Sequence, residues 1–256
     1  MSIVRWVLQE NMKNQLSLRQ MIEALERIGV EFQTISLLPF KPNIPKEAFP
    51  KDGAKIICWG PSFVPRTIKH PSLSPGIWYN NKKFRWSTFK ENWADLMLSQ
   101  NGKVLSLQLA VENLTSKPVF MRPDEDTKAF DGGLYSQEYP PQVGNNFGNI
   151  KVVQAPVRSV QDEWRFFVVN QDIVESSSYR VMGKPNIHGV VPPEAVKLAK
   201  QAIQKWGPSK VYCLDIGLSN GRYGIIEANC FNASRLYGAS PAGVAMAVSE
   251  FVSGYS

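Results

Sequence analysis

Hydrophobic residues follow two different spacings along the first part of the chain, and each spacing predicts a type of secondary structure. Short apolar runs at 2–8, 31–35 and 54–60 are bounded by polar residues and are typical of strands. Over 17–29, apolar positions recur every three or four residues and predict a helix with Ser17 as its N-cap. The order strand, helix, strand, strand favours a small α/β domain at the start of the chain.

Short strands and polar turns alternate through the second half of the chain, after a helix predicted over 88–98. Thr88 and Glu91 have the spacing of a capping box for that helix. From about residue 117 onward, runs rich in β-branched and aromatic residues predict strands, and one amphipathic stretch predicts a helix. The expected strands are 117–123, 150–157, 163–169, 173–180, 210–218 and 223–229, and the expected helix is 192–207.

Composition and charge narrow the class of protein. A chain of 256 residues with 43% hydrophobic and 20% charged residues can fold around a core without disulfides or structural metals. Cys58, Cys213 and Cys230 are far apart and lack a paired motif, so we expect buried reduced thiols. The net charge of +7 favours negatively charged partners such as nucleotide phosphates, nucleic acid or acidic peptides.

The apolar run at the start of the sequence is interrupted by Arg5 and Gln9, which argues against a signal peptide. No stretch of about 18 uncharged apolar residues occurs in the sequence, so no membrane-spanning helix is predicted. We therefore expect a cytoplasmic protein with no membrane partner.

Three oxygen-bearing side chains lie on the last predicted hairpin. Asp215 is in its first arm, and Glu227 and Asn229 end its second arm on a shared face. Such ligands suit Mg²⁺, which usually takes one or two protein carboxylates and completes its octahedron with water and phosphate oxygens. The alternative is that both acids are strand-end residues in solvent or in structural ion pairs.

The loop of this hairpin decides whether the two acids can meet. A two-residue loop at Asn220 and Gly221 would pair position 215 with 226 and put Asp215 and Glu227 on opposite faces. A three-residue loop over 220–222, with a bulge, would pair position 215 with 227 instead. We therefore predict the three-residue loop.

An aspartate, a glutamate twelve residues later and then x-Asn, on an antiparallel hairpin that follows a helix, resemble the magnesium-binding end of the ATP-grasp enzymes. The preceding segments are similar in order. "VVQAPV" at 152–157 matches the hinge that holds adenine, while "EWRFF" and "YR" match strands that bring arginines to phosphate and substrate. The resemblance covers about 117–238.

One departure from the typical family pattern points to a particular clade. "VFMRP" carries Arg122 where typical members have a lysine before a flexible loop, and "TKAFDGG" supplies Lys128. With Arg165, this set is similar to the two arginines and a lysine of a small clade common in bacteriophages and bacteria. Arg165 is the strongest candidate because its neighbours Phe167 and Val169 are apolar, and an inward arginine needs an anionic partner.

The resemblance implies a role for each candidate residue. The implied catalytic residues are Arg122, Lys128, Arg165 and Arg180; the nucleotide-binding residues are Lys128, Gln154, Ala155, Pro156, Val157 and Arg165; the metal ligands are Asp215, Glu227 and Asn229; and the substrate-binding residues are Arg180, Asn232 and Arg235.

The resemblance also implies an architecture and an activity. The expected α+β fold has a small Rossmann-like α/β domain over 1–105 and an ATP-grasp domain of two ATP-clamping lobes over 106–256, with a hinge near 152–158. The expected activity is that of an ATP- and Mg²⁺-dependent ligase, which forms an amide-type bond through an acyl phosphate. The sequence does not identify the carboxylate donor or the amine acceptor, which could be an amino acid, a peptide or a protein.

Two segments support other functions. Lys128 and Asp131 resemble the Lys-x-Asp-Gly of nucleic-acid ligases, whose lysine becomes adenylated, but here the spacing is one residue longer. The segment 78–90, "WYNNKKFRWSTFK", interleaves cations with aromatics, as single-stranded nucleic-acid grooves do, although such aromatics are more often core residues. A nucleotidyltransferase and a non-catalytic nucleic-acid-binding protein are therefore the alternatives.

Overall fold

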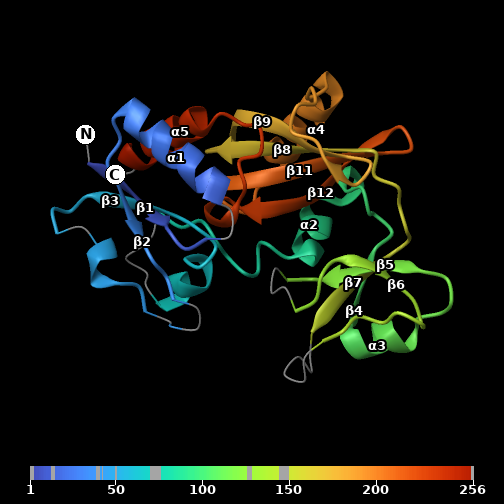
Figure 1. The fold of residues 1–256 in the computed structure, drawn as a ribbon. Coiled ribbons are helices and arrows are strands. Elements are labelled where there is room, and N and C mark those ends of the chain that lie inside the picture. Colours follow the sequence, from blue (N-terminus) through green and yellow to red (C-terminus); the bar gives the residue numbers. More distant parts are fainter. Residues whose placement is uncertain are drawn as a thin grey trace.

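The computed structural model describes residues 3–12, 15–38, 41, 43–49, 51–69, 76–125, 129–143 and 150–254. Their strands form a three-stranded parallel sheet, a four-stranded antiparallel sheet and a five-stranded antiparallel sheet (Figure 1). The expected mixed α+β content is confirmed. Short 3-10 helices lie at Lys46–Ala48, Val64–Lys69, Ala94–Leu96 and Phe231–Ala233.

The three-stranded sheet forms from the first part of the chain, in the order that the hydrophobic pattern predicts. β1 (Val4–Gln9) lies between β2 (Phe32–Ile35) and β3 (Lys55–Trp59), and both neighbours run parallel to it. α1 (Gln15–Ile28) connects β1 to β2. A parallel pair needs such a crossover, which explains why an amphipathic helix follows β1 directly.

A helix near the C-terminal end completes the core of this first sheet. α5 (Pro241–Ser253) packs against α1, and Figure 1 shows the two helices side by side. The indole nitrogen of Trp6 donates to the Ser249 hydroxyl at 2.9 Å, and Trp6 shares one buried cluster with Val244 and Val248. The sequence pattern did not predict α5, because its small apolar residues form no clear amphipathic stripe.

The two predicted capping boxes are wrong. α1 begins at Gln15, so Ser17 is a buried residue inside the helix. α2 (Trp86–Trp93) likewise begins before Thr88. Its first turn is capped from a distant part of the chain, because the Asp124 carboxylate accepts from the Ser87 nitrogen and hydroxyl, both at 2.8 Å. This long-range cap fastens α2 to the end of the four-stranded sheet.

The four-stranded sheet is built from short segments. Its order is β4 (Lys103–Ser106), β7 (Lys151–Ala155), β5 (Val119–Pro123) and β6 (Gly133–Tyr135), and α3 (Leu107–Glu112) follows β4. Strands β5 and β7 were predicted, whereas β4, β6 and α3 were not. Elements of three to six residues are too short to show a hydrophobic period.

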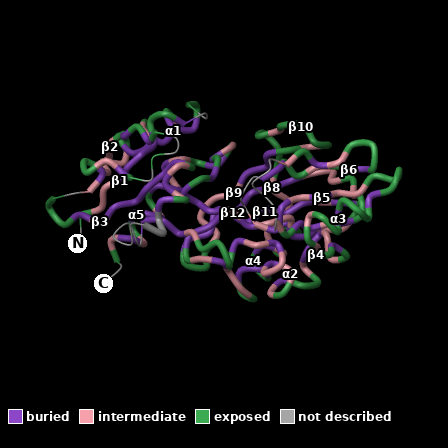
Figure 2. Tube along the Cα trace, turned by 90° about the horizontal axis from the view of Figure 1, so that it is seen from below, coloured by how far each residue is buried: buried purple, intermediate pink, exposed green. Residues whose placement is uncertain are grey.

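The five-stranded sheet lies between two helices. Its order is β10 (Lys184–Pro185), β9 (Asp172–Val181), β8 (Asp162–Val169), β11 (Val211–Ser219) and β12 (Arg222–Cys230). Phe166 and Leu214 share a buried cluster with α4 (Pro193–Lys205), while Phe167 and Cys213 share the cluster that contains α5. The middle strands are therefore buried on both faces, as Figure 2 shows.

The hairpin of β11 and β12 pairs the two acids, but not by the predicted loop. Its loop has only two residues, Asn220 and Gly221, whose φ angles of 50° and 75° fit a type I′ turn. Asp215 nevertheless pairs with Glu227, because the register shifts between Asp215 and Ile216 and leaves Ile226 as a bulge. The predicted pairing is confirmed, and the three-residue loop is wrong.

Two further expectations concern the cysteines and the membrane. Cys58, Cys213 and Cys230 are free and buried, as predicted. Within the described ranges, no helix has both the length and the apolar character needed to cross a bilayer.

Candidate active site

Three charged side chains stand in a row across neighbouring strands of the five-stranded sheet. Arg165 on β8 is the register partner of Asp215 on β11, which is in turn the partner of Glu227 on β12. Register partners point to the same face of a sheet, so the three side chains converge. The Arg165 guanidinium binds Asp215 in a bidentate manner, Nε to Oδ1 at 2.8 Å and Nη2 to Oδ2 at 2.7 Å.

Asn229 connects the two carboxylates. Its Nδ2 donates to Asp215 Oδ2 at 2.9 Å and to Glu227 Oε1 at 3.0 Å. Asn229 lies two residues after Glu227 on β12, so both side chains share a face. The structure therefore brings together the three residues predicted as metal ligands.

The Arg165–Asp215 pair is buried, with residue exposures of 6% and 1%. The stacked rings of Tyr179 and Tyr237 lie beside the guanidinium, whose Cζ is 5.7 Å and 5.1 Å from their centroids. Burial opposes the charge of Arg165, but the Asp215 carboxylate more than offsets this effect and holds the pKa of Arg165 well above its ordinary value. Arg165 is therefore a permanent positive charge at the centre of the site.

A second ion pair joins the four-stranded sheet to the five-stranded sheet. Arg122 on β5 pairs with Glu227 through Nη1 and Oε2. Burial alone would raise the pKa of Glu227, but the Arg122 charge and the Asn229 amide together lower it below its usual value. Glu227 is thus held in its ionised form between the two sheets.

The Glu227 ion pair should make part of the stability depend on pH. A carboxyl whose pKa is lowered on folding stabilises the protein above its unfolded value, near 4.5, and this contribution is lost as the pH falls through the lowered value. We expect the difference in free energy of unfolding between the wild type and Glu227→Gln to shrink as the pH falls from about 6 to about 3. Urea titrations across that range measure it, and a constant difference would contradict an ionised Glu227 beside Arg122.

Arg180 on β9 is partly free to meet a substrate. Its Nη1 donates to Glu163 Oε1 at 3.2 Å, and the Tyr179 hydroxyl donates to the other Glu163 oxygen at 2.6 Å. Glu163 is buried, whereas the Arg180 side chain is 47% exposed. The arrangement fixes the direction of the guanidinium while leaving much of it accessible.

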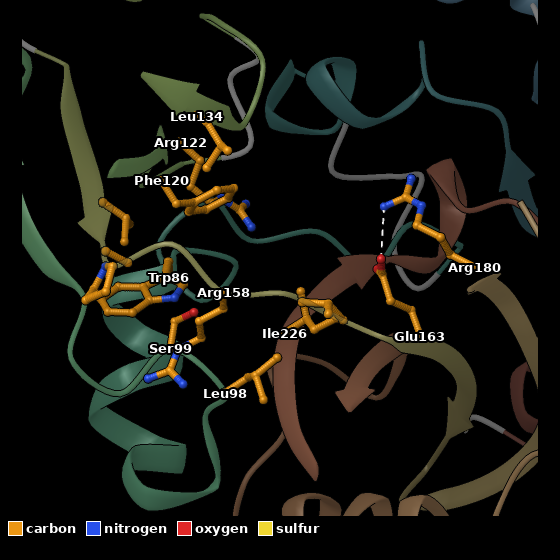
Figure 3. A pocket seen from close by; sticks show the side chains of 14 residues that line it. Trp86, Leu98, Ser99, Phe120, Arg122, Leu134, Arg158, Glu163, Arg180 and Ile226 are labelled. Carbon is orange, nitrogen blue, oxygen red and sulfur yellow. Dashed lines mark hydrogen bonds and ion pairs between the residues drawn. The ribbon is translucent and has the colours of Figure 1, made fainter. Parts of the chain in front are cut away.

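These charged groups line the larger of two adjoining cavities. The larger cavity has a volume of about 500 Å³ and is lined by Arg122, Asp131, Arg165, Arg180, Asp215 and Glu227, among others. The smaller cavity, of about 220 Å³, has mostly apolar walls that include Trp86, Phe120 and Val153. Phe120, Arg122, Glu163, Arg180 and Ile226 line both, and Figure 3 shows how several of these side chains border the smaller one.

A glycine lets one wall of the smaller cavity form. The Leu98 nitrogen donates to the Ile225 carbonyl at 2.8 Å, which holds the segment after α2 against β12. A Cβ atom on Gly224 would lie only 2.7 Å from the Leu98 Cα atom. The absence of that atom allows Leu98 and Ser99 to reach the cavity.

The predicted adenine hinge lies at this smaller cavity. Ala155 and Pro156 line it, whereas the Gln154 side chain donates to the Ala110 carbonyl at 3.5 Å and Val157 is exposed. Gln154 points away because successive residues of β7 face opposite sides of the sheet. Arg158 also lines the cavity, and no motif in the sequence indicated it.

Two of the remaining candidates lie elsewhere. Lys128 is outside the described residues, although Asp131, which follows it, lines the larger cavity. Arg235 is exposed and is not among the residues that line either cavity, but its carbonyl accepts from Arg165 Nη1 at 3.5 Å.

Asn232 was predicted to bind substrate, but the structure places it in the core with no exposed surface. Its amide nitrogen donates to the carbonyls of Cys58 and Gly76, and its side-chain oxygen accepts from the Trp78 nitrogen at 2.9 Å. These three bonds satisfy backbone groups in the segments that follow the first sheet. Asn232 is therefore a structural residue that joins this region to the end of β12.

Asn232→Ala should destabilise the protein by about 2–4 kcal/mol, because it leaves three buried backbone groups without partners. The free energy of unfolding in urea measures the effect. Asn80→Ala is the matched control, since its side-chain oxygen also accepts from two backbone nitrogens, those of Lys82 and Lys83, but in an exposed turn. We expect a loss below about 1 kcal/mol for the control, and equal losses would contradict the assignment.

The aromatic residues of segment 78–90 do not form an exposed stacking surface. Phe84, Trp86 and Phe89 are buried, at 3%, 2% and 1% exposure, and belong to the core between α2, α4 and the five-stranded sheet. Lys82 and Lys83 are exposed. The segment therefore matches the alternative in which its aromatics are core residues and its cations are solvated.

The residues present fit a magnesium ion. Asp215 and Glu227 supply two carboxylates that reach the same amide nitrogen, and Asn229 adds an amide oxygen. Within the described part of the chain, no cluster of three or more His, Cys, Asp or Glu could hold a metal. An ion bound here would thus take its other ligands from water and phosphate oxygens.

Comparison with known families gives a match over more than half of the chain. The matching family is an ATP-grasp domain, the second family of the clade with two arginines and a lysine, and the match covers residues 103–247. No curated protein sequence matches significantly.

Solved structures share the fold at low sequence identity. A RimK-domain ATP-grasp protein from Sphaerobacter thermophilus has a TM-score of 0.62 and 15% identity, covering 98% of this chain and 100% of that one. The D-alanine–D-alanine ligase from Bacillus anthracis complexed with ATP has a TM-score of 0.58 and 13% identity, covering 97% and 96%. The macrocyclase MdnC from Microcystis aeruginosa, bound to the precursor peptide MdnA, has a TM-score of 0.52 and 11% identity, covering 96% and 99%.

Proposed function

The chain belongs to the ATP-grasp family, and on that premise we propose that it is an ATP- and Mg²⁺-dependent ligase joining a carboxylate to an amine. The observation that carries the proposal is the network of Arg122, Glu227, Asp215 and Arg165 on the wall of the larger cavity. A mostly apolar cavity suited to a flat ring adjoins it. The two together match the two ends of a nucleotide.

The proposed reaction has two steps. A carboxylate oxygen of the donor attacks the γ-phosphorus of ATP, the bond from that phosphorus to the β–γ bridging oxygen breaks, and ADP leaves. The amine nitrogen then attacks the acyl carbon, phosphate leaves with the electron pair of the broken C–O bond, and the nitrogen loses a proton. Both steps need alignment and charge neutralisation more than covalent help from the protein.

The cations of the larger cavity supply that neutralisation. Arg165 is fixed by Asp215 and offers a permanent charge, and Arg122 and Arg180 enter from two different sheets. Lys128 completes this set in our proposal. Preorganised donors of this kind typically contribute about a hundredfold to a thousandfold each to the rate.

Asp215, Glu227 and Asn229 are the proposed magnesium ligands. When bound, magnesium neutralises phosphate oxygens and orients the triphosphate. In the described structure Arg122 and Arg165 neutralise the two carboxylates instead. Each guanidinium therefore occupies a position beside the metal ligands from which it can contact phosphate.

We further propose where the nucleotide-binding part begins and what the substrates are. The boundary between a pre-ATP-grasp domain and the ATP-grasp domain lies near residue 105, which is supported by the family match that starts at residue 103. The proposed substrates are amino acids or peptides. The support comes from two proteins with this fold, a D-alanine–D-alanine ligase complexed with ATP and a macrocyclase bound to a precursor peptide.

A screen for ADP release tests the proposed function. The protein is incubated with ATP, Mg²⁺ and pools of amino acids, peptides and polyamines, and ADP and condensed products are measured. We expect ADP release that needs both a carboxylate and an amine. Covalent labelling of Lys128 by α-labelled ATP, with pyrophosphate release, would instead support the nucleotidyltransferase.

A further inference from the structure

The smaller cavity has two ends that differ in their polar groups. At the end shared with the larger cavity lies the Glu163–Arg180 ion pair. At the other end, Arg158 and Ser99 lie beside the Trp86 ring and Leu98, and Figure 3 shows this group opposite the ion pair. Arg158 is in the loop between β7 and β8, directly after the predicted hinge.

Arg158 differs from the other arginines of the two cavities because it has no partner among the described residues. Its Nε is buried and makes no hydrogen bond within the described chain. By contrast, Arg122, Arg165 and Arg180 each form an ion pair with a carboxylate. A guanidinium has five donors and no acceptor, and burying such a group without an acceptor is costly. An acceptor from a ligand would remove that cost.

We propose that Arg158 reads the nucleobase, by donating a hydrogen bond to a ring nitrogen of the adenine. This inference rests on the proposed function, in which the triphosphate lies beside Arg165 and Asp215. The base then falls in the smaller cavity, between apolar walls that include Phe120, Val153 and Ala155. The ring nitrogens of adenine are acceptors, which is the chemistry that a donor-only side chain can recognise.

The position of Arg158 separates this role from phosphate binding. Arg158 lines only the smaller cavity, whereas Arg122 and Arg180 line both and Arg165 lines the larger one. Three cations are therefore available for phosphate without it. A donor at the base end should also select, because a base that points an amino group at Arg158 would set donor against donor.

Arg158→Met tests the proposal, because methionine keeps much of the length of the side chain and removes its charge and donors. Binding of the non-hydrolysable analogue AMPPNP with Mg²⁺ is measured by calorimetry, and so is binding of tripolyphosphate with Mg²⁺. We expect AMPPNP to bind about 10- to 100-fold more weakly and tripolyphosphate to bind unchanged. Arg19→Met, which removes an exposed charge from α1, is the control for net charge and should bind both ligands as the wild type does.

Deaza analogues identify the contact. The triphosphates of 1-deaza-, 3-deaza- and 7-deazaadenosine each lack one ring nitrogen, and one of them should bind the wild type about 10- to 100-fold more weakly than ATP. That penalty should disappear in Arg158→Met, because the donor is already absent. Thermal unfolding verifies that the variant is folded.

Three results would overturn the proposal. They are AMPPNP binding by Arg158→Met within twofold of the wild type, equal loss of AMPPNP and tripolyphosphate, and wild-type affinity for all three deaza analogues. Failure of the wild type to bind any nucleotide is a different result, and it would refute the proposed function itself.

Discussion

Glu227→Gln is expected to keep the fold and to lose about two to three orders of magnitude of ATP-dependent turnover. Glutamine retains the size of the side chain and can still accept hydrogen bonds from Arg122 and Asn229. It removes one of the two carboxylate charges that the proposed magnesium site needs, and it leaves Arg122 without its counter-charge. The rate of ADP release at saturating ATP measures the loss.

The matched control is Asp95→Asn, which also converts an ion-paired carboxylate into an amide. Asp95 pairs with Lys205 at 3.2 Å on the surface, where its side chain is 76% exposed, so we expect wild-type turnover. Circular dichroism and thermal unfolding verify that both variants are folded. Turnover of Glu227→Gln within about threefold of the wild type would remove Glu227 from the site.

The second large effect is on stability. Asp215→Asn should destabilise the protein by about 3–5 kcal/mol, because Arg165 is buried and would keep its charge without a carboxylate partner. The high pKa of Arg165 would depend on that carboxylate, so the variant has to bury a poorly compensated cation or open the sheet. The free energy of unfolding in urea at neutral pH measures the loss.

A double variant separates the charge from the packing at this position. Arg165→Met with Asp215→Leu replaces the whole ion pair by apolar side chains and should recover most of the stability that Asp215→Asn loses, while turnover stays abolished. If the double variant is as unstable as Asp215→Asn, the cost comes from shape and not from the unpaired charge.

The hairpin shows what the sequence can and cannot predict about the site. The facing of Asp215 and Glu227 followed from the chemistry that they would perform together. The means was wrong, because Asn220 and Gly221 form the tight turn that their sequence favours and the extra residue is Ile226 instead. A bulge inside a strand has no local sequence signature, whereas an Asn-Gly turn has a strong one.

Tertiary contacts explain most of what the pattern missed in the fold. The start of α2 is set by Asp124, which lies 37 residues after Ser87, and no local capping signal reports such a partner. The long amphipathic helices α1 and α4 were predicted because each has one apolar face. α5 was not predicted, because it lies between α1 and the five-stranded sheet and is buried on more than one side.

The site residues that were missed or misassigned share a cause. Arg158 carries no motif, and its interest lies in the absence of a partner among the described residues, which only a structure can show. Asn232 follows the metal-binding strand closely, so its position in sequence suggested substrate binding. Its side chain turns toward Cys58, Gly76 and Trp78, which are more than 150 residues away in the chain.

The packing of α5 against α1 has a consequence for biosynthesis. Trp6 in β1 obtains its full cover only when Ser249 and Val248 arrive, so the first sheet emerges from the ribosome with part of its apolar surface bare. At about 5–20 residues per second, that surface waits roughly 10 to 50 seconds for translation to reach α5. The nascent chain is therefore a candidate client for holdase chaperones over this interval, even though the finished protein hides every one of these side chains.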